Sequence, residues 1–448
     1  MRKTISTVLS LLIILSAFLC TFTAQGATYT PDVALYSKAY MLINLDDDTH
    51  PVVVEKNSGE RMYPASLTKI VTAMVALQNV KDLSAEVEVS KQAYDTLLGT
   101  GAQVAGLKIG DVLTVEELLY LTMVHSACDA TEVLAEYVGG TRYEFVKMMN
   151  DYVASLGCTD THFENPDGLH DDNHYTTAAD MAVITLDAMK NEMFNKISET
   201  VEYKYKNTNF YHTNLMLRSG FVSYYYEYAK GIKTGSTEQA GYCVISKASK
   251  DGYNYLAVVM GAPVIDYNKD GYVEKCSFID ARSLFKWAFD SLKYSTLAEQ
   301  NEVLSEVAVK NGKDADSVQL VAKRDLTVIV PSSLDKSAVI VEPIDKPEEI
   351  SAPVSQGDTV CKANIIYADQ VVGTVELVAS KDVELSTFLK LINGIKSFFS
   401  MTIVKIILAA VVLFAVVYGI LIYNNYKKKK KRRMQREQNY YDNQNETE

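Results

Sequence analysis

The stretch YPASLTKI, residues 63–70, is the part of the chain that says most about its fold. Ser66 and Lys69 are three residues apart, and residues at this spacing share one face of a helix. A helix through Ser66 would therefore hold the Lys69 amine within reach of the Ser66 hydroxyl. A serine hydroxyl is a weak nucleophile until a base takes its proton. A lysine can be that base when burial or a nearby positive charge makes it less basic.

Two later segments strengthen this interpretation, because a Ser-x-x-Lys spacing alone occurs by chance on many helices. The tripeptide Ser-Ala-Cys at 126–128 lies between the apolar segments 118–124 and 130–138, within a mostly helical region. The tripeptide Lys-Thr-Gly at 233–235 lies in a predicted strand, 231–237, and further strands are expected at 241–246 and 253–261. A hairpin at 40–55 and a closing helix at 278–294 complete a mixed α/β domain.

With these segments in view, the chain resembles the D-alanyl-D-alanine carboxypeptidases, which are low-molecular-mass penicillin-binding proteins. The segments that carry the resemblance are YPASLTK at 63–69, SACDA at 126–130, GIKTG at 231–235, and NPDGLH with HYTTA between 165 and 178. The resemblance covers residues 35–295 and implies the serine β-lactamase type of α/β fold, an antiparallel sheet flanked by helices plus a helical lobe. A small all-β domain and one C-terminal transmembrane helix fit the same architecture more loosely.

The resemblance also implies an activity. The protein would be a serine-type carboxypeptidase that removes the terminal D-alanine from peptidoglycan stem pentapeptides, and β-lactams would inhibit it. Ser66 would attack the peptide carbonyl and become an acyl-enzyme, while Lys69 accepts its proton. Ser126 lies in a turn, where its hydroxyl can relay a proton to the leaving amine. No cofactor is expected.

Residues on the predicted strand at 231–237 are expected to bind the substrate. The Lys233 cation and the Thr234 hydroxyl could hold the free carboxylate of a C-terminal D-alanine by charge-assisted hydrogen bonds. Gly235, which lacks a side chain, would let the substrate backbone approach closely. By the resemblance, the backbone amides of Ser66 and Ser236 would form the oxyanion hole, worth about 3–4 kcal/mol per donor.

Cys128 departs from the family pattern, in which the middle motif is usually Ser-x-Asn. An asparagine amide both donates and accepts hydrogen bonds and so suits a substrate peptide group, whereas a thiol is a weak partner for either task. Cys128 is therefore a tolerated variant in the substrate-binding set, or the mark of a slow enzyme, or of an inactive protein that binds or senses β-lactams. A further hypothesis is a reactive Cys128, because two nearby lysines would favour the thiolate.

Other functions compete with the carboxypeptidase. A β-lactamase needs a second base to activate water, and no convincing Glu-x-x-Leu-Asn segment follows Ser126. A DD-endopeptidase would share every motif. A non-catalytic wall-binding or β-lactam-sensing protein belongs to a different class, and Cys128 keeps that hypothesis open.

The chain divides into segments of different composition and residue pattern. We expect a signal peptide at 1–26, the catalytic domain at 27–295, a β-rich domain at 296–385, a juxtamembrane helix at 386–400, a transmembrane helix at 401–423 and a basic tail at 424–448. The run Lys427–Arg433 is of the kind that stays in the cytoplasm. The protein is thus predicted to cross the cell membrane once, with its catalytic domain outside and its C-terminus in the cytoplasm.

Charge argues against one class of partner, and the cysteine content argues against two kinds of structural site. Residues 1–26 and 401–448 hold 11 of the 44 Lys and Arg but only 4 of the 56 Asp and Glu, so the part between them has a net charge of −19. That charge argues against nucleic acid as a partner. Five cysteines follow the signal segment with no Cys-x-x-Cys, which suggests neither a zinc site nor a disulfide framework.

One loop has the pattern of a metal site. Asp266, Asn268 and Asp270 occupy positions one, three and five of a calcium-binding loop, and Gly271 occupies position six. Position twelve is Ser277 instead of glutamate, so the alternative is a plain turn before the last helix. The histidines lack a spacing such as His-Glu-x-x-His, which disfavours a metallopeptidase.

Overall fold

The computed structural model describes residues 28–445, and the predicted signal peptide lies outside the described residues. The chain forms two compact units. The first contains the chain up to Leu297 together with 327–340 and 365–373, and the second contains 298–326, 341–364 and the chain from Thr374 onward.

A five-stranded antiparallel sheet is the centre of the first unit, with the strand order β2-β1-β9-β8-β7. Its strands are β1 (Ala39–Asn44), β2 (Val52–Lys56), β7 (Ala229–Thr237), β8 (Gly241–Lys250) and β9 (Tyr253–Ala262). The predicted hairpin and the three later strands are therefore confirmed, and the N-terminal hairpin joins the later strands through β1 and β9. β7 ends up at one edge of the sheet, where it can line a site.

The strand β1 shows why both faces of the sheet are covered. Ala39, Met41 and Ile43 belong to the core that the sheet shares with the helical lobe. Tyr40 and Leu42, which alternate with them, belong to a second core, formed with α9 (Cys276–Ser291). Because successive strand residues point to opposite faces, an apolar run of this kind must be buried on both sides.

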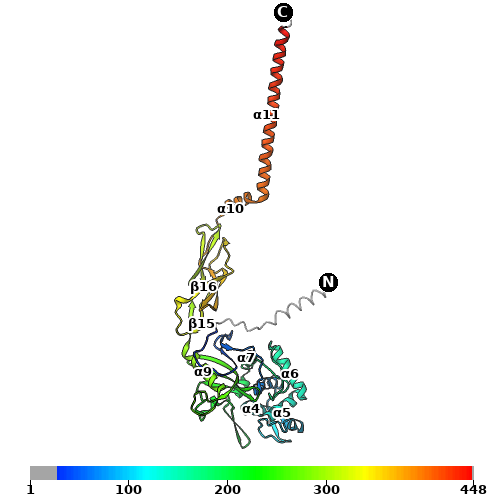
Figure 1. Ribbon diagram of the computed structural model, residues 1–448, viewed down its shortest axis with the longest axis vertical. Helices are drawn as coiled ribbons and strands as arrows, with labels where there is room; N and C mark the ends of the chain where they lie inside the picture. The colour runs from blue at the N-terminus through cyan, green and yellow to red at the C-terminus, as the bar shows by residue number, and fades with distance from the viewer. Residues whose placement is uncertain (1–27, 446–448) are drawn as a thin grey trace. The chain divides into compact units, whose positions relative to one another are not determined.

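The helical lobe carries the rest of the site. It contains α2 (Lys69–Asn79), α4 (Val115–Val124), α5 (Cys128–Gly139), α6 (Arg142–Ser155), α7 (Ala178–Ala188) and α8 (Glu192–Ser198) (Figure 1). Two of these helices begin at the caps that their sequences provide. Thr114 and Glu117 form a capping box at α4, and the Thr177 hydroxyl accepts the Asp180 amide at α7.

Several short elements had no clear signal in the sequence. They are α3 (Lys91–Asp95), β3 (Glu86–Glu88), β4 (Val112–Thr114), β5 (Glu202–Tyr205), β6 (Thr208–Tyr211), β10 (Val264–Ile265) and β11 (Glu274–Lys275). The strands pair in twos, β3 with β4, β5 with β6 and β10 with β11. Two to four residues are too few to show a clear alternation of apolar and polar side chains.

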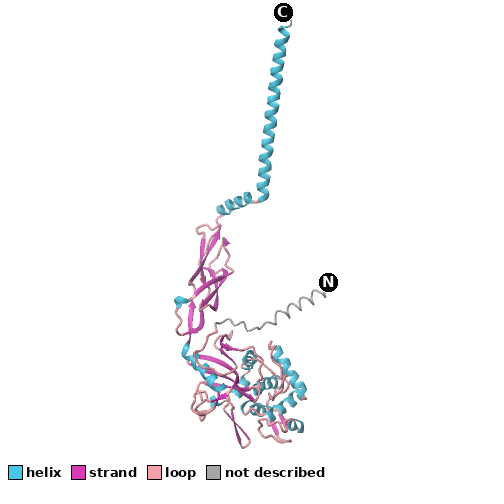
Figure 2. Ribbon diagram, viewed as in Figure 1, coloured by secondary structure: helices cyan, strands magenta, loops and turns pink. Residues whose placement is uncertain are grey.

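The second unit is rich in strands, as the sequence predicts (Figure 2). Its six-stranded sheet has the order β16-β18-β19-β14-β13-β17. These strands are β13 (Val303–Lys310), β14 (Ser317–Ala322), β16 (Ile340–Ile344), β17 (Glu349–Ser351), β18 (Thr359–Tyr367) and β19 (Gln370–Ala379). A separate two-stranded sheet, β12 (Leu292–Ala298) with β15 (Leu326–Pro331), lies almost entirely within residues of the first unit.

The C-terminal part is helical, with α10 (Thr387–Ser400) followed by α11 (Thr402–Asn445). Residues Thr402–Glu437 are long and apolar enough to cross a membrane, with a mean hydropathy of 2.9 in the most apolar window. α11 continues to Asn445 and so includes most of the predicted basic tail. Residues 424–445 contain no Gly or Pro and are rich in Lys, Arg and Gln, which are good helix formers.

The packing of α9 on the sheet can be tested with Phe285→Ala. Phe285 is completely buried in the core between α9 and the sheet. Removing its ring should cost about 3–5 kcal/mol and lower the melting temperature of the first unit by roughly 6–20 °C. Tyr143→Ala is the control, because that side chain is exposed and should change the melting temperature little. Equal melting temperatures for the two variants would contradict this packing.

Candidate active site

Ser66 lies at a sharp entry into a helix. A short 3-10 helix, η1 (Ala65–Thr68), precedes α2, where the sequence predicted one regular helix. The residue before Ser66, Ala65, has a φ of +48°, a conformation that non-glycine residues rarely adopt. The turn places Lys69 Nζ 3.0 Å from Ser66 Oγ, as the spacing of the two residues predicts.

The Lys69 amine is completely buried and has further partners. It donates a hydrogen bond to the backbone carbonyl of Asp167, and it is 3.4 Å from Cys128 Sγ at the start of α5. A buried cation is costly unless such groups surround it. The amine is therefore held in one place between three segments that are far apart in the sequence.

Ser126 and Lys233 form a second pair across the site. Ser126 has a φ of +63° in the turn between α4 and α5, a strained conformation of the kind that gathers at functional sites. Lys233 Nζ donates a hydrogen bond to Ser126 Oγ at 2.8 Å. Burial, and next the nearby Lys69 amine, hold the pKa of Lys233 well below its usual value. Lys233 can therefore exchange a proton with Ser126 more readily than an exposed lysine can.

The backbone around Ser66 is packed against two glycines. A Cβ atom on Gly235 of β7 would lie 2.7 Å from the Pro64 carbonyl oxygen and 3.1 Å from the Ser66 nitrogen. A Cβ atom on Gly168 would lie 2.0 Å from the Ala65 carbonyl oxygen. Gly235 therefore lets β7 approach the nucleophile's own backbone, which is a different reason for glycine from the predicted approach of substrate.

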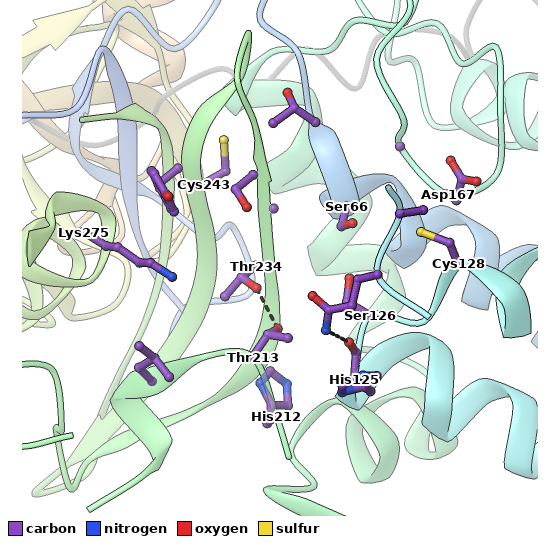
Figure 3. A pocket seen from close by; sticks show the side chains of 18 of the residues that line it. Ser66, His125, Ser126, Cys128, Asp167, His212, Thr213, Thr234, Cys243 and Lys275 are labelled. Atoms are coloured by element: carbon purple, nitrogen blue, oxygen red, sulfur yellow. Dashed lines mark hydrogen bonds between the residues drawn. The ribbon is translucent and has the colours of Figure 1, made fainter. Parts of the chain in front are cut away.

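These residues line a cavity of about 700 Å³ (Figure 3). The cavity brings together six of the predicted residues. The buried Lys69 contacts Ser66 and Cys128 among them, and the buried Lys233 contacts Ser126. The six are Ser66, Ser126, Cys128, Thr234, Gly235 and Ser236. Sequence reasoning missed Thr213, whose hydroxyl accepts a hydrogen bond from Thr234 Oγ1 at 2.6 Å, and Lys275 at the far side of the cavity. Neither belongs to a recognisable motif, so no sequence signal could have found them.

Cys128 is buried, and its backbone amide donates to the Gln103 carbonyl at 2.8 Å. Burial raises the pKa of the Cys128 thiol, and the nearby Lys69 amine opposes this effect without overcoming it. The thiol form is thus favoured, contrary to the sequence hypothesis of a thiolate stabilised by two lysines. All five cysteines in the described part of the chain are free and buried.

The loop with the calcium pattern joins β10 to β11 and bonds to itself. The Asp266 carboxylate accepts the backbone amides of Asp270 and Gly271 at 3.0 and 2.9 Å, and Asp270 accepts that of Tyr272. Among the described residues, no group of three or more His, Cys, Asp or Glu is arranged to hold a metal ion. Calcium binding at Asp266, Asn268 and Asp270 stays a sequence prediction.

Family models match most of the extracytoplasmic segments predicted from the sequence. The model described as D-alanyl-D-alanine carboxypeptidase, peptidase S11, matches residues 25–264, which is more than half of the chain. The chain belongs to this family. A second model, the C-terminal domain of penicillin-binding protein 5, matches residues 293–385, which contain the β-rich sheet.

Individual relatives agree with the family assignment. The D-alanyl-D-alanine carboxypeptidase DacF of Bacillus subtilis is 29% identical over 88% of this chain and 98% of its own length. A D-alanyl-D-alanine carboxypeptidase of a Streptomyces species is 30% identical over 59% of this chain and 94% of its own length. The crystal structure of penicillin-binding protein 5 from Haemophilus influenzae matches with a TM-score of 0.59 and 26% identity, over 80% of this chain and 99% of that chain.

One solved relative bears on Cys128. The DD-transpeptidase of a Streptomyces strain matches with a TM-score of 0.52 and 28% identity, over 58% of this chain and all of that chain. Its solved mutants include a serine changed to alanine and, two positions further on, a cysteine changed to alanine. A Ser-x-Cys spacing therefore occurs in another member of this fold.

The close packing of β7 on the nucleophile predicts the effect of Gly235→Ala. The added methyl group would lie 2.7 Å from a backbone oxygen, so Ser66 or β7 must shift. A shift of about 1 Å can cost on the order of 100-fold in rate. We expect acylation by a fluorescent penicillin to fall by at least this order of magnitude. Gly59→Ala, where no atom lies within 4 Å of the new methyl group, should react like the wild type. Normal acylation of Gly235→Ala would show that this packing does not set the position of Ser66.

Proposed function

We propose that this protein is a serine-type D-alanyl-D-alanine carboxypeptidase that removes the terminal D-alanine of peptidoglycan stem pentapeptides and is acylated by β-lactams. The observation that carries the proposal is the 3.0 Å contact between Lys69 Nζ and Ser66 Oγ beside an open cavity. Membership of the family supports the reaction.

Acylation would begin at Ser66. Lys69 takes the proton of the Ser66 hydroxyl as the oxygen attacks the carbonyl of the penultimate D-alanine. The backbone amides of Ser66 and Ser236 would stabilise the oxyanion. The start of a helix leaves amides such as that of Ser66 free to donate, and Ser236 lies on β7 at the edge of the sheet. Ser126, in contact with Lys233, would pass a proton to the leaving D-alanine nitrogen.

Substrate recognition would depend on the edge strand β7. The substrate carboxylate would meet Lys233 and Thr234, and an arriving negative charge would favour the protonated form of the buried Lys233. Cys128 would face the substrate peptide beside Lys69. Water would then attack the acyl-enzyme and release the shortened peptide, its spare proton restoring Ser126 while Lys69 returns its proton to Ser66 Oγ.

We also propose a role for each segment of the chain. Residues 27–295 would form the catalytic domain, and 296–385 a spacer that holds the site away from the membrane. The apolar start of α11 would span the bilayer, with the positive run Lys427–Arg433 in the cytoplasm and the catalytic domain outside, where peptidoglycan lies.

The first test is D-alanine release from a diacetyl-Lys-D-Ala-D-Ala peptide by the full chain in detergent. Wild type should release D-alanine and Ser66→Ala should not, because the variant lacks the hydroxyl that attacks the carbonyl. Cys128→Asn should retain or raise the rate, because an amide is the better partner for a peptide group. Penicillin labelling of wild type without D-alanine release, together with release by Cys128→Asn, would favour the alternative of a penicillin-binding sensor. Release that survives Ser66→Ala would refute the proposed mechanism.

A second candidate function is transfer of the acyl group to an amine instead of water. The similarity to a DD-transpeptidase, and the serine and cysteine two positions apart in that protein, favour this candidate. In a mixture of peptide and a primary amine, a transpeptidase would form the amide adduct in preference to the hydrolysed peptide. A carboxypeptidase would yield mainly the hydrolysed peptide, and mass spectrometry of the products separates the two functions.

A further inference from the structure

A buried group of ionisable side chains lies behind Lys69. Glu132 is one turn after Cys128 on α5, so the two side chains share the face of the helix that meets Lys69. Only 2% of Glu132 is exposed. An isolated buried carboxylate is costly, so its partners determine its state of charge.

Glu132 has two kinds of partner. On one side, Nε of Arg142 on α6 is 3.1 and 3.2 Å from the two carboxyl oxygens of Glu132. On the other side, the Glu132 carboxyl is in hydrogen-bonding contact with that of Asp167. Asp167 is 1% exposed, and its backbone carbonyl accepts the hydrogen bond from Lys69. The contacts thus run from Arg142 through the two carboxyls to Asp167, whose backbone carbonyl holds the Lys69 amine.

The hydrogen bonds of Asp167 are incomplete when both carboxyls are ionised. Its Oδ1 accepts the Leu169 amide at 2.9 Å, whereas its buried Oδ2 has no hydrogen-bond partner among the described residues. An ionised Glu132 has no hydrogen to offer, and two touching carboxylates repel each other. A single proton between the two carboxyls would satisfy Oδ2 and remove the repulsion.

We propose that Glu132 is a positioning residue for Lys69, and that its carboxyl shares one proton with the carboxyl of Asp167. The pair then carries one negative charge, which Arg142 balances, so no net negative charge faces Lys69. A second negative charge there would stabilise the ammonium form of Lys69, which cannot take the Ser66 proton. The role at Lys69 rests on the proposed function, whereas the shared proton does not depend on it.

The pH range in which the two carboxyls share a proton follows from the groups around them. Burial, and next Asp167, raise the pKa of Glu132 to about 8, and Arg142 acts in the opposite direction. The charged groups around the pair are Arg142 from α6 and Lys69 from α2, and the Cys128 thiol of α5 stays neutral because burial raises its pKa. The shared proton is therefore present at neutral pH and lost above about pH 8.

The decisive variant is Glu132→Gln, assayed as the full chain in detergent. Its amide can always donate to Asp167 Oδ2 and cannot lose a proton in this range. We expect the rate of acylation by a fluorescent penicillin to fall about tenfold per pH unit above pH 8 in the wild type, while the variant lacks this decline. Glu136→Gln, one turn further along α5, makes the same chemical change at a carboxyl that accepts the Ser90 hydroxyl, and it should keep the wild-type pH profile.

A second readout does not need activity. An unfolded glutamate loses its proton near pH 4.5, whereas folded Glu132 keeps it up to about pH 8. The folded protein binds more protons in this window, so the wild type loses stability as the pH rises through it. Glu132→Gln has no such loss. The melting temperature of the wild type should therefore drop by several degrees relative to the variant between pH 5 and pH 8.

The outcomes separate this inference from the proposed function. A wild type that no penicillin acylates would refute the function, and the melting temperatures would still decide on the shared proton. If Glu132→Gln kept both the alkaline decline and the wild-type dependence of melting temperature on pH, the shared proton would be refuted. Should the glutamine variant fail to fold, Arg142→Met replaces it. Removing the guanidinium must move the alkaline decline to higher pH, and an unmoved decline would overturn the inference.

Discussion

Two buried lysine amines are the constraint on which the rest of the first unit depends. Lys69 and Lys233 are both completely buried, and an isolated cation in such a place is far less stable than in water. The protein supplies partners for each amine: Ser66, Cys128 and the Asp167 carbonyl for one, Ser126 and the Thr234 carbonyl for the other. The fold around them must therefore hold a helix start, a helix-to-helix turn, a loop and an edge strand in fixed relation.

The sequence predicts those parts of the site that local spacing determines. Ser66 and Lys69 are on one helical turn, and three residues of spacing are enough to place them in contact. Lys233, Thr234 and Gly235 are in a run that has the pattern of a strand. The resemblance to a known family joined these segments, since nothing in their spacing says that residues more than a hundred positions apart should meet.

The remaining features depend on tertiary packing that a single sequence does not express. Glu132 looks like an ordinary helix residue, and only its burial beside Asp167 and Arg142 reveals a shared proton. Burial likewise raises the pKa of the Cys128 thiol more than the neighbouring lysines lower it. Sequence reasoning had considered only the lysines. The sheet and the long helices were predictable because periodicity over ten residues is a strong signal, whereas the short paired strands β3 to β6 were not.

The two glycines beside Ser66 have a consequence for how the protein can be observed. Gly168, in the loop between α6 and α7, and Gly235, on the edge strand β7, both meet the backbone at 64–66. Their contacts exist only when the lobe and the sheet have both formed and docked, so the nucleophile is not assembled in any partial structure of the first unit. The amount of Ser66 acylated by a β-lactam would then equal the amount of correctly folded protein. A fluorescent antibiotic would therefore report on the folding of this protein in living cells.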